Sequence, residues 1–338
     1  MMTNGYIELD HGSGGIASNE LISSMIIGRL DNEFLRLMED SAVIDLPGTR
    51  IAFTTDSYVV DPIFFPGGDI GSLAVHGTVN DLSMRGAIPR YLTLSLILEE
   101  GLPMDHLKRI IDSAADAAGH AEVIVVAGDT KVVPRGHADK IFINTSGIGI
   151  VPPGISVSTH DARPGDVILV NGNIGDHGMA ILACREGLSF TSPIKSDSAP
   201  LNSLVSTLLK AAPNSVHCLR DPTRGGVATA LNEIAINSGV TALIEEDCLP
   251  FTPSVKSASE MLGLDPLYAA NEGKVLVFAS ADEAPQILTA MKGHRLGKAA
   301  QIIGRVTARS AAPVFIKTRV GGTRILPMLT GEQLPRIC

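Results

Sequence analysis

Glycines at the start of a predicted helix are the first residues that could do chemistry. The segment Gly12–Ser13–Gly14–Gly15, preceded by His11, leads into a predicted helix over 16–30. Backbone N–H groups at such a position can bind an anion. The segment also fits a loose GxGxxA dinucleotide pattern, but that fold requires a buried strand before the loop, and none is predicted here. A helix start with a flexible lead-in remains the alternative.

Aspartates at the predicted ends of elements form the second group: Asp40, Asp56, Asp81 and Asp129. Carboxylates gathered at element ends can converge on one pocket and bind Mg²⁺, and Lys131 could place a positive charge beside a phosphate. Each acid alone is more often a cap or a turn residue. Asp129 carries the strongest signal, because it follows the apolar run 123–127.

Three short motifs occur in the second half of the chain: GDHG at 175–178, DPTRGG at 221–226 and NEGK at 271–274. The glycines of the first two precede predicted helices and suit anion contact, although ordinary turn chemistry explains each motif alone. The nine histidines show no HxH or HExxH spacing, which argues against a zinc site.

Cys338 differs from the other cysteines, which occupy positions 184, 218 and 248 in or near predicted elements. It is the last residue of the sequence and follows a stretch, 327–337, without hydrophobic periodicity. We expect this stretch to be a mobile tail, and a thiol there contributes nothing to a core. A frayed end is the alternative. Arg336 is expected to offset negative charge near this thiol.

The elements that must position these residues alternate between strands and helices. Strands are predicted at 51–60, 91–98, 122–127, 141–151, 167–171, 274–279, 301–306 and 314–317, and helices at 16–30, 70–85, 104–118, 178–185, 200–211, 227–237 and 253–262. Prolines and glycines interrupt the pattern over 151–166. We therefore predict an N-terminal domain over 1–155, a C-terminal α/β domain over 156–326 and a flexible tail over 327–338.

Composition excludes several classes of function. The 338 residues are 45% hydrophobic and only 4% aromatic, which predicts an aliphatic core. The formal charge of −9 argues against nucleic-acid binding. The sequence has no P-loop, no CxxC pair, no signal peptide and no apolar run of membrane-spanning length, so we expect a cytoplasmic protein outside the membrane.

Together the motifs resemble the HypE family of hydrogenase maturation factors. The matching segments are HGSGG at 11–15, TTDSYVVDPIFFPGGDIG at 54–71, VNDLSMRGAIPRY at 79–91, GDTKVV at 128–133, the three motifs above and PRIC at 335–338. This family belongs with the aminoimidazole ribonucleotide synthetases, selenophosphate synthetases and thiamine monophosphate kinases. The resemblance implies a two-domain α+β homodimer whose N-terminal sheets pair across the dimer.

The resemblance also implies an ATP- and Mg²⁺-dependent reaction on Cys338. The carbamoyltransferase HypF would load the cysteine with a carbamoyl group, and dehydration would yield a thiocyanate. The HypC–HypD complex would accept the cyano group for the iron of [NiFe]-hydrogenase. In this scheme Glu272 is the base and Lys131 faces the reacting phosphate. The residues implied to contact the nucleotide are His11, Gly12, Ser13, Gly14, Gly15, Asp56, Asn80, Asp129 and Thr130. The residues implied to bind the metal are Asp40, Asp56, Asp81 and Asp129.

Two other interpretations remain open. A selenophosphate synthetase of the same superfamily would carry cysteine or selenocysteine near the glycine-rich loop, whereas this chain has no cysteine before Cys184. A non-enzymatic assembly scaffold, with the tail as a docking peptide, would not require Asp81, Asp129 and Lys131. An ATPase assay distinguishes enzyme from scaffold.

Overall fold

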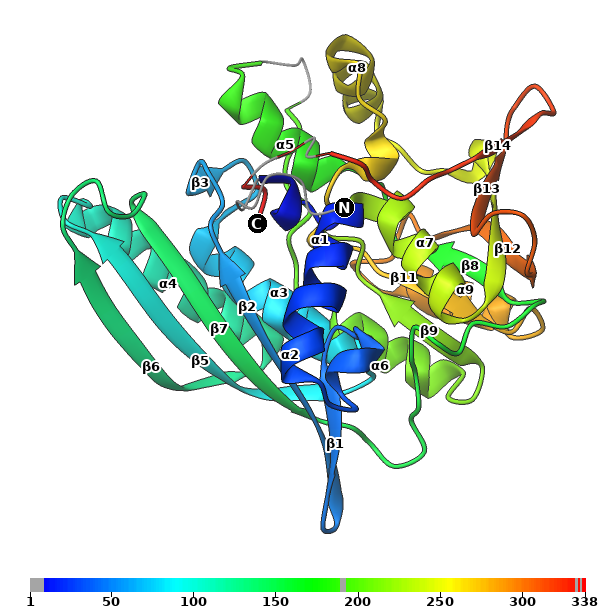
Figure 1. Ribbon diagram of the computed structural model, residues 1–338, viewed down its shortest axis with the longest axis horizontal. Helices are drawn as coiled ribbons and strands as arrows, with labels where there is room; N and C mark the ends of the chain where they lie inside the picture. Colours follow the sequence, from blue (N-terminus) through cyan, green and yellow to red (C-terminus); the bar gives the residue numbers. More distant parts are fainter. Residues whose placement is uncertain (1–8, 189–192, 332–333, 335) are drawn as a thin grey trace.

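The computed structural model describes residues 9–188, 193–331, 334 and 336–338. It contains two large β-sheets, each accompanied by helices, and a small hairpin of β3 (Phe64–Phe65) and β4 (Gly68–Asp69). Figure 1 shows the two sheets on opposite sides of the molecule. Among the described residues, no helix is long and apolar enough to cross a membrane.

The first sheet is mostly antiparallel, in the order β1-β2-β7-β5-β6, with β5 and β6 parallel. Its strands are β1 (Ala42–Leu46), β2 (Thr49–Tyr58), β5 (Ile88–Glu99), β6 (Ile124–Val133) and β7 (Ile141–Ile150). Helix α3 (Ile70–Met84) packs on β2 and β7, and α4 (Met104–Ala121) packs on α3. The other face of the sheet carries no helix in Figure 1.

Local sequence explains where α3 begins and which side of α4 is buried. Asp69 caps α3 by accepting hydrogen bonds from the N–H groups of Gly71 and Ser72, and the Asp69 N–H in turn donates to the Ser72 hydroxyl oxygen. On α4 the buried positions are Ile110, Ala114, Ala117, Ala118 and Ala121, which form one helical stripe. Small alanines on this stripe allow the two helices to approach closely.

The second sheet has seven strands in the order β14-β13-β10-β12-β8-β11-β9. They are β8 (Val167–Val170), β9 (Val216–Arg220), β10 (Val240–Glu245), β11 (Leu276–Ala279), β12 (Gln301–Ala308), β13 (Val314–Lys317) and β14 (Thr323–Ile325). The accompanying helices are α5 (Asp176–Arg185), α6 (Asn202–Ala211), α7 (Gly226–Asn237), α8 (Pro253–Leu262) and α9 (Ala284–Gly293). Helix α7 packs on one face of the sheet, and α6 and α9 pack on the other.

One hydrophobic cluster joins the two halves. Ala52, Leu82 and Met84 of the first half pack in the same buried cluster as Leu169 and Leu204 of the second. Because this shared core contains fully buried aliphatic side chains, the two sheets hold a fixed relation to each other. Residues from both halves can therefore build one site.

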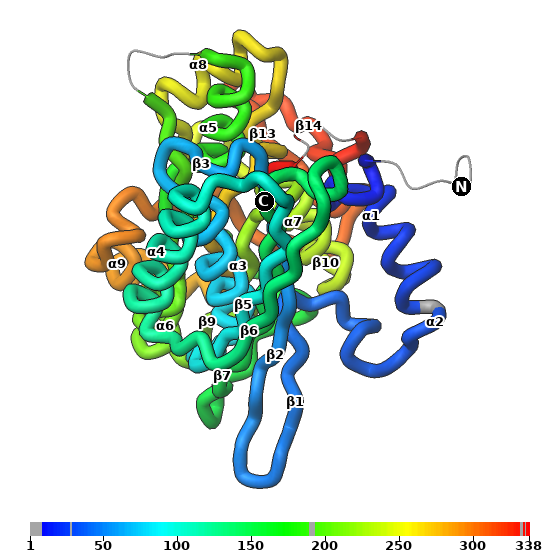
Figure 2. Tube along the Cα trace, turned by 90° about the vertical axis from the view of Figure 1, so that its left-hand side faces the viewer, coloured from blue at the N-terminus to red at the C-terminus, as the bar shows by residue number. Residues whose placement is uncertain are grey.

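The N-terminal helical segment stands apart from both cores. It runs continuously through α1 (Ile16–Glu20), a π-helical stretch (Leu21–Ile27) and α2 (Gly28–Leu30), with a short 3₁₀ turn before it (Leu9–Gly12) and another after it (Leu35–Leu37). Figure 2 shows the segment projecting from the side of the molecule. Its continuity agrees with the predicted helix over 16–30.

Several elements lacked a sequence signal and were not predicted: β1, β9, β10, α9 and β14. Strand β9 has the sequence VHCLR, with a histidine in place of an apolar residue, and α9 has Pro285 at its second position and no side-chain cap. The strand predicted at 122–127 is longer in the structure and continues to Val133. This extension moves Asp129 from a strand end to the middle of a strand, so the expectation that it terminates the strand is wrong.

Candidate active site

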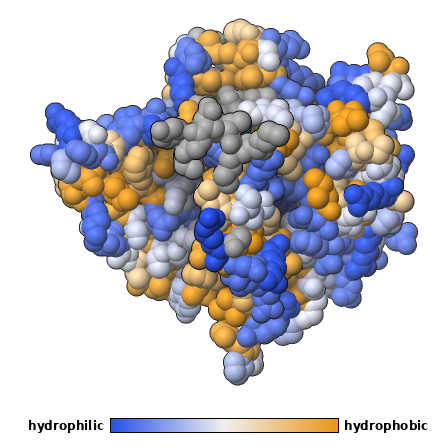
Figure 3. Space-filling model, in the orientation of Figure 1, coloured by the Kyte–Doolittle hydropathy of each residue, from blue (hydrophilic) through white to orange (hydrophobic). Residues whose placement is uncertain are grey.

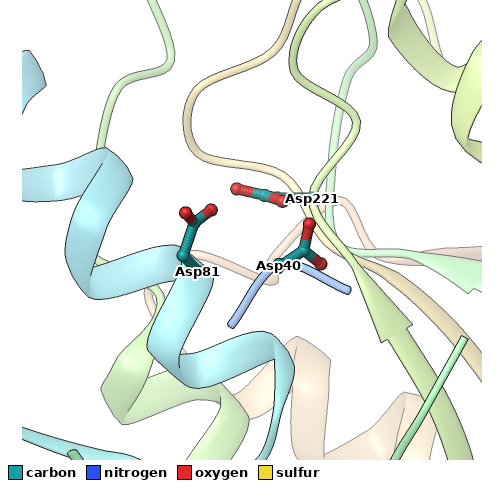
Figure 4. Close-up of side chains that lie close together, drawn as sticks. All are labelled: Asp40, Asp81 and Asp221. Atoms are coloured by element: carbon teal, nitrogen blue, oxygen red, sulfur yellow. The ribbon is translucent and has the colours of Figure 1, made fainter. Parts of the chain in front are cut away.

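Three aspartates from distant parts of the chain meet between the two domains. Asp40 precedes β1, Asp81 lies in the last turn of α3, and Asp221 follows β9. Each offers a carboxylate oxygen, and these atoms all lie within 4.8 Å of one another. Figure 4 shows the three side chains converging on one point. Sequence reasoning predicted Asp40 and Asp81 here but missed Asp221 as a member of the cluster.

Burial and mutual repulsion disturb the ionisation of this cluster. Burial raises the pKa of Asp221 to about 6; the nearby Arg220 guanidinium opposes this rise and the Asp56 carboxylate adds to it. Burial also raises the pKa of Asp81 well above its ordinary value, with further contributions from Asp56 and Asp221. Arg220 forms an ion pair with Asp40 and another with Glu233, at 3.0 Å. One arginine thus balances only part of the negative charge.

The donor set fits a hard divalent cation. Oδ2 of Asp40 and Oδ2 of Asp221 are buried and have no hydrogen-bond partner among the described residues. Buried carboxylate oxygens without partners are costly unless a cation or a proton compensates them. Oxygen-only ligation is what Mg²⁺ prefers. The geometry therefore fits a magnesium ion held by Asp40, Asp81 and Asp221.

Asp56 lies beside this cluster on β2. Its Oδ2 accepts a hydrogen bond of 3.0 Å from the Tyr58 hydroxyl, and the side chain raises the pKa of both Asp81 and Asp221. The Tyr58 hydroxyl in turn packs against Gly77 of α3, where an added Cβ would lie 2.2 Å from it. The absence of a side chain at Gly77 therefore leaves room for the Tyr58 hydroxyl that donates to Asp56. Asp56 can share the cation or contact a phosphate beside it.

Asp129, Thr130 and Lys131 lie elsewhere in this chain. Through the sheet register, Ser57 pairs with Asn144, Asn144 with Ser95, and Ser95 with Asp129. Asp129 is therefore three strands away from the residue next to Asp56, or roughly 14 Å at the usual strand spacing. It forms a 2.7 Å ion pair with Lys131 on the exposed strand β6. Within one chain, Asp129 does not join the acidic cluster.

The three C-terminal motifs meet on the other side of the acids. Asn271 donates to the Pro222 oxygen at 3.1 Å, and its Oδ1 accepts from the Gly175 N–H at 2.7 Å, which links NEGK to DPTRGG and GDHG. Asp197 accepts from the N–H of Glu272 and Gly273 and pairs with Lys274 Nζ at 2.8 Å. An added Cβ at Gly273 would lie 1.9 Å from the Asp197 oxygen, so only glycine fits there.

Asn80 has a different position from the one we expected. Its side-chain NH₂ donates to the main-chain oxygens of Ala199 and Glu272, and its Oδ1 accepts from the Leu201 N–H at 2.8 Å. The side chain is 1% exposed. Its hydrogen-bonding groups are thus used inside the protein, where they fix the loop that carries Glu272, rather than directed at a nucleotide.

Glu272 is buried with an unsatisfied oxygen. The residue is 2% exposed, and its Oε1 has no hydrogen-bond partner among the described residues. Burial raises its pKa well above the ordinary value; the carboxylates of Asp221, Asp197 and Asp56 add to this, and Arg224 opposes it. A carboxylate held in this way is a stronger base than one in water.

Cys338 lines a pocket together with Arg224 and lies within electrostatic reach of Glu272. Burial raises its pKa to about 12, the charge of Glu272 contributes to the rise, and Arg224 opposes it. Ile337 is 5% exposed, and Cys338 packs against a hydrophobic cluster of the first domain. Ile337 and Cys338 are therefore packed against the protein, which differs from the mobile end and the thiol outside any core that the sequence led us to expect. The cation beside the thiol is Arg224, because Arg336 pairs with Asp139 instead.

The glycine-rich loop contributes to the pocket that Cys338 lines. Gly12 and Ser13 line the pocket together with Arg224, Leu329 and Cys338. The Gly14 N–H donates to the Ser18 hydroxyl at 2.9 Å, and the Gly15 N–H to the Ser13 hydroxyl at 3.2 Å. Both amides therefore have internal partners in this conformation. His11 lies at the start of the loop, and its main-chain oxygen accepts from the Ser18 hydroxyl at 2.8 Å.

Comparison with known families gives two matches along the chain. The model of the AIR synthase related protein N-terminal domain matches residues 38–151, and that of the C-terminal domain matches residues 163–317. Carbamoyl dehydratase HypE of Cupriavidus necator is 51% identical over 99% of this chain and 95% of its own length. Carbamoyl dehydratase HypE of Escherichia coli K12 is 46% identical over 98% of this chain and 99% of its own length.

Solved structures resemble the fold closely. A HypE chain crystallised as a HypE–HypF complex has a TM-score of 0.87, 52% identity, and coverage of 91% of this chain and 99% of its own. A HypE structure in complex with ATP has a TM-score of 0.83, 50% identity, and coverage of 98% and 100%. A thiamine monophosphate kinase from Aquifex aeolicus, 20% identical with a TM-score of 0.65 over 87% and 95%, shares the fold alone.

Proposed function

This chain belongs to the HypE family of carbamoyl dehydratases within the AIR synthase related proteins, and we propose that Cys338 carries the group that it dehydrates. The substrate would be a carbamoyl group bound to the Cys338 sulfur as a thiocarboxamide. The product would be a thiocyanate on the same sulfur, which supplies cyanide for the iron of [NiFe]-hydrogenase. The observation that carries this proposal is that Cys338 lines one pocket with Arg224 and that the charge of the buried Glu272 acts on its thiol.

The reaction needs the amide oxygen converted into a leaving group. The thiocarboxamide oxygen attacks the γ-phosphorus of ATP, ADP leaves, and one nitrogen proton is lost as the imidate phosphate forms. The C–O bond then breaks, phosphate leaves, and the second nitrogen proton is removed to give S–C≡N. Water is thereby removed from the carbamoyl group at the cost of one ATP, which becomes ADP and phosphate.

Glu272 is placed to take the nitrogen protons. Its charge acts on the Cys338 thiol, the residue is 2% exposed, and its Oε1 has no partner among the residues that the structure describes. Its raised pKa makes its ionised form a strong base. Arg224 favours that ionised form and can also stabilise negative charge that develops on the oxygen being transferred.

Asp40, Asp81 and Asp221, with Asp56 beside them, would hold Mg²⁺ for the nucleotide. When bound, the ion would neutralise the charge of the phosphates during transfer. The unpartnered oxygens of Asp40 and Asp221 support this assignment. ATP would then lie between the acids and the glycine-rich loop, whose Gly14 and Gly15 amides would exchange hydroxyl partners for phosphate oxygens.

Loading with the carbamoyl group requires the tail to leave the pocket. A pKa of about 12 keeps the inserted thiol protonated near neutral pH, whereas a thiolate is the nucleophile that loading needs. The tail would therefore be loaded by HypF in an exposed position and dehydrated in the inserted one. HypC–HypD would accept the cyano group, and the cytoplasm is the compartment proposed for these transfers.

In a homodimer, the partner subunit would bring Asp129, Thr130 and Lys131 to the acidic cluster, from which they are distant within one chain. Strand β6 is an edge strand with exposed Ile124, Val126 and Val132, at 62%, 58% and 68% of their full exposure. Long apolar edge strands are usually covered by another chain. Figure 3 shows hydrophobic residues over this sheet at the left of the view. Pairing of two copies through this sheet would let Asp129 and Lys131 face the phosphates bound by the partner.

Intact-mass spectrometry tests the reaction directly. The protein is incubated with HypF and carbamoyl phosphate, then with ATP and Mg²⁺ or with a non-hydrolysable ATP analogue. We expect gain of one carbamoyl group, followed by loss of one water only with hydrolysable ATP. Loading without water loss, at any ATP concentration, would contradict the dehydratase and favour the scaffold.

Val126→Lys tests the dimer, since it should yield a monomer in size-exclusion chromatography with light scattering, whereas Val320→Lys on an exposed turn should not.

A further inference from the structure

The packed tail pairs through its main chain with the segment that follows β2. The Val59 N–H donates to the Cys338 oxygen at 3.0 Å, and the Asp61 N–H donates to the Arg336 oxygen at 3.3 Å. The pairing is antiparallel, because the partner numbers run in opposite directions. Two such hydrogen bonds are too few to hold an extended segment against its conformational entropy. Other groups must hold the tail in place.

Helix α5 supplies two of these groups. The His177 Nε2 lies 2.7 Å from the Ile337 oxygen, and Arg185 at the other end of the helix donates to the main-chain oxygens of Asp61 and Arg336. On the tail, both residues bind main-chain oxygens. These contacts leave the Cys338 thiol free of the helix, in the pocket that Arg224 also lines.

The surroundings of His177 fix which ring nitrogen donates. The ring is 0% exposed, its Nδ1 lies 2.8 Å from the Ser196 hydroxyl, and the Phe65 ring packs edge-on at 5.5 Å between centroids. Burial lowers the pKa of this histidine, which favours the neutral ring. Because a carbonyl oxygen can only accept, the proton lies on Nε2 and the Ser196 hydroxyl donates to Nδ1.

We propose that His177 and Arg185 are positioning residues that clasp the tail backbone and thereby set how long Cys338 stays in the inserted position. This inference rests on the proposed carrier role of Cys338. It gives the GDHG motif a function, because its histidine holds the tail. The clasp acts only on the inserted tail, so its loss should weaken dehydration and spare or favour loading outside the pocket.

Two substitutions at one position separate the clasp from general packing. His177→Gln keeps an N–H group near the place of Nε2, whereas His177→Asn keeps polarity near Nδ1 and loses the donor to Ile337. The measurement is the rate of Cys338 alkylation by iodoacetamide, followed by peptide mass mapping in a Cys184→Ser, Cys248→Ser background. We expect a rate increase of about tenfold for His177→Asn and Arg185→Ala, and of less than about threefold for His177→Gln.

His137→Asn, on an exposed turn, is the matched control and should leave the rate unchanged. An unchanged rate in both His177→Asn and Arg185→Ala would overturn the clasp. So would equal acceleration by His177→Gln and His177→Asn, which would indicate loss of packing. Because alkylation needs neither carbamoyl donor nor ATP, this result stands even where the proposed function fails.

A second readout uses the reaction itself. With HypF and carbamoyl phosphate, His177→Asn should load at the wild-type rate or faster, and should then lose water about tenfold more slowly when ATP is added. A damaged fold would slow both steps together, and that outcome would refute the positioning role.

Discussion

Replacing Asp221 by asparagine should stabilise the protein while it removes activity. Asp221 is 3% exposed, and its Oδ2 has no partner among the described residues. Its pKa rises from 3.8 to about 6 on folding, chiefly through burial. A raised acid pKa means that the folded state prefers the protonated form. The contribution of protonated Asp221 to the free energy of unfolding is therefore complete below about pH 4, and it is lost as the pH rises through 6.

The size of the effect follows from the shift. A difference of about 2 pKa units corresponds to about 3 kcal/mol of lost stability at pH 8, at about 1.4 kcal/mol for each unit. Asparagine carries no charge at any pH and avoids most of this loss. We expect a gain of about 2–3 kcal/mol at pH 8, or roughly 5 °C in melting temperature. At pH 5 about half of the gain should remain.

Thermal unfolding in EDTA, followed by circular dichroism at pH 8 and pH 5, measures this gain. Asp247→Asn is the control, because that carboxylate is largely exposed and paired with Arg319; little change is expected there. ATP turnover of Asp221→Asn should be lost in the same preparation, since a metal ligand is missing. An Asp221→Asn protein less stable than wild type at pH 8, or a gain that grows toward pH 5, would refute the electrostatic reasoning.

Three further predictions concern the same site. Asp81→Asn should abolish ATP turnover with the fold retained, and turnover at the wild-type rate would remove Asp81 from the metal site. Glu272→Gln and Lys131→Ala should accept the carbamoyl group but stall before water loss, so mass spectrometry should find the carbamoylated form persisting with ATP; full conversion would show that neither residue is needed. The rate of Cys338 alkylation should keep rising about tenfold for each pH unit above pH 9. The raised pKa of about 12 means that the inserted tail favours the protonated thiol, and this stabilisation is lost as the pH rises toward 12. A rate that levels off near pH 9, as in a free peptide of residues 326–338, would contradict insertion.

The two-domain α+β fold predicted from the motifs is confirmed by the AIR synthase related matches and the HypE structures. Most strands and helices also lie where hydrophobic periodicity placed them. Strand β10 and helix α9 were not predicted, because their burial depends on partners far away in the sequence. Periodicity detects a face that is buried on one side, and β10 is buried almost throughout.

The acidic site was only partly predictable. Asp40 and Asp81 were found as acids at element ends, and the same rule would have found Asp221 had the strand before it, β9, been recognised. Asp129 is the opposite case, an acid that we expected in the cluster and that lies outside it within one chain. Its strand continues past it along the edge of the sheet, and a sequence pattern does not reveal whether a strand lies at an edge.

The roles of His177 and Arg224 needed the folded structure. GDHG and DPTRGG look like turns before helices, and nothing in their spacing points to the tail more than a hundred residues later. Tertiary contacts place His177 against Ile337 and Arg224 beside Cys338. Arg336, the nearest cation in the sequence, instead pairs with Asp139.

The central claim is that Cys338 carries the reacting group, and one measurement tests it most directly. Wild type, Cys338→Ala and Cys184→Ala are each incubated with HypF, carbamoyl phosphate and ATP, then analysed by intact mass and peptide mapping. Cys184, exposed on α5, is the matched control thiol. We predict modification of wild type and Cys184→Ala at Cys338 only, and none of Cys338→Ala, which should still bind ATP. Modification of Cys338→Ala at Cys184, Cys218 or Cys248, at the wild-type yield, would contradict the account.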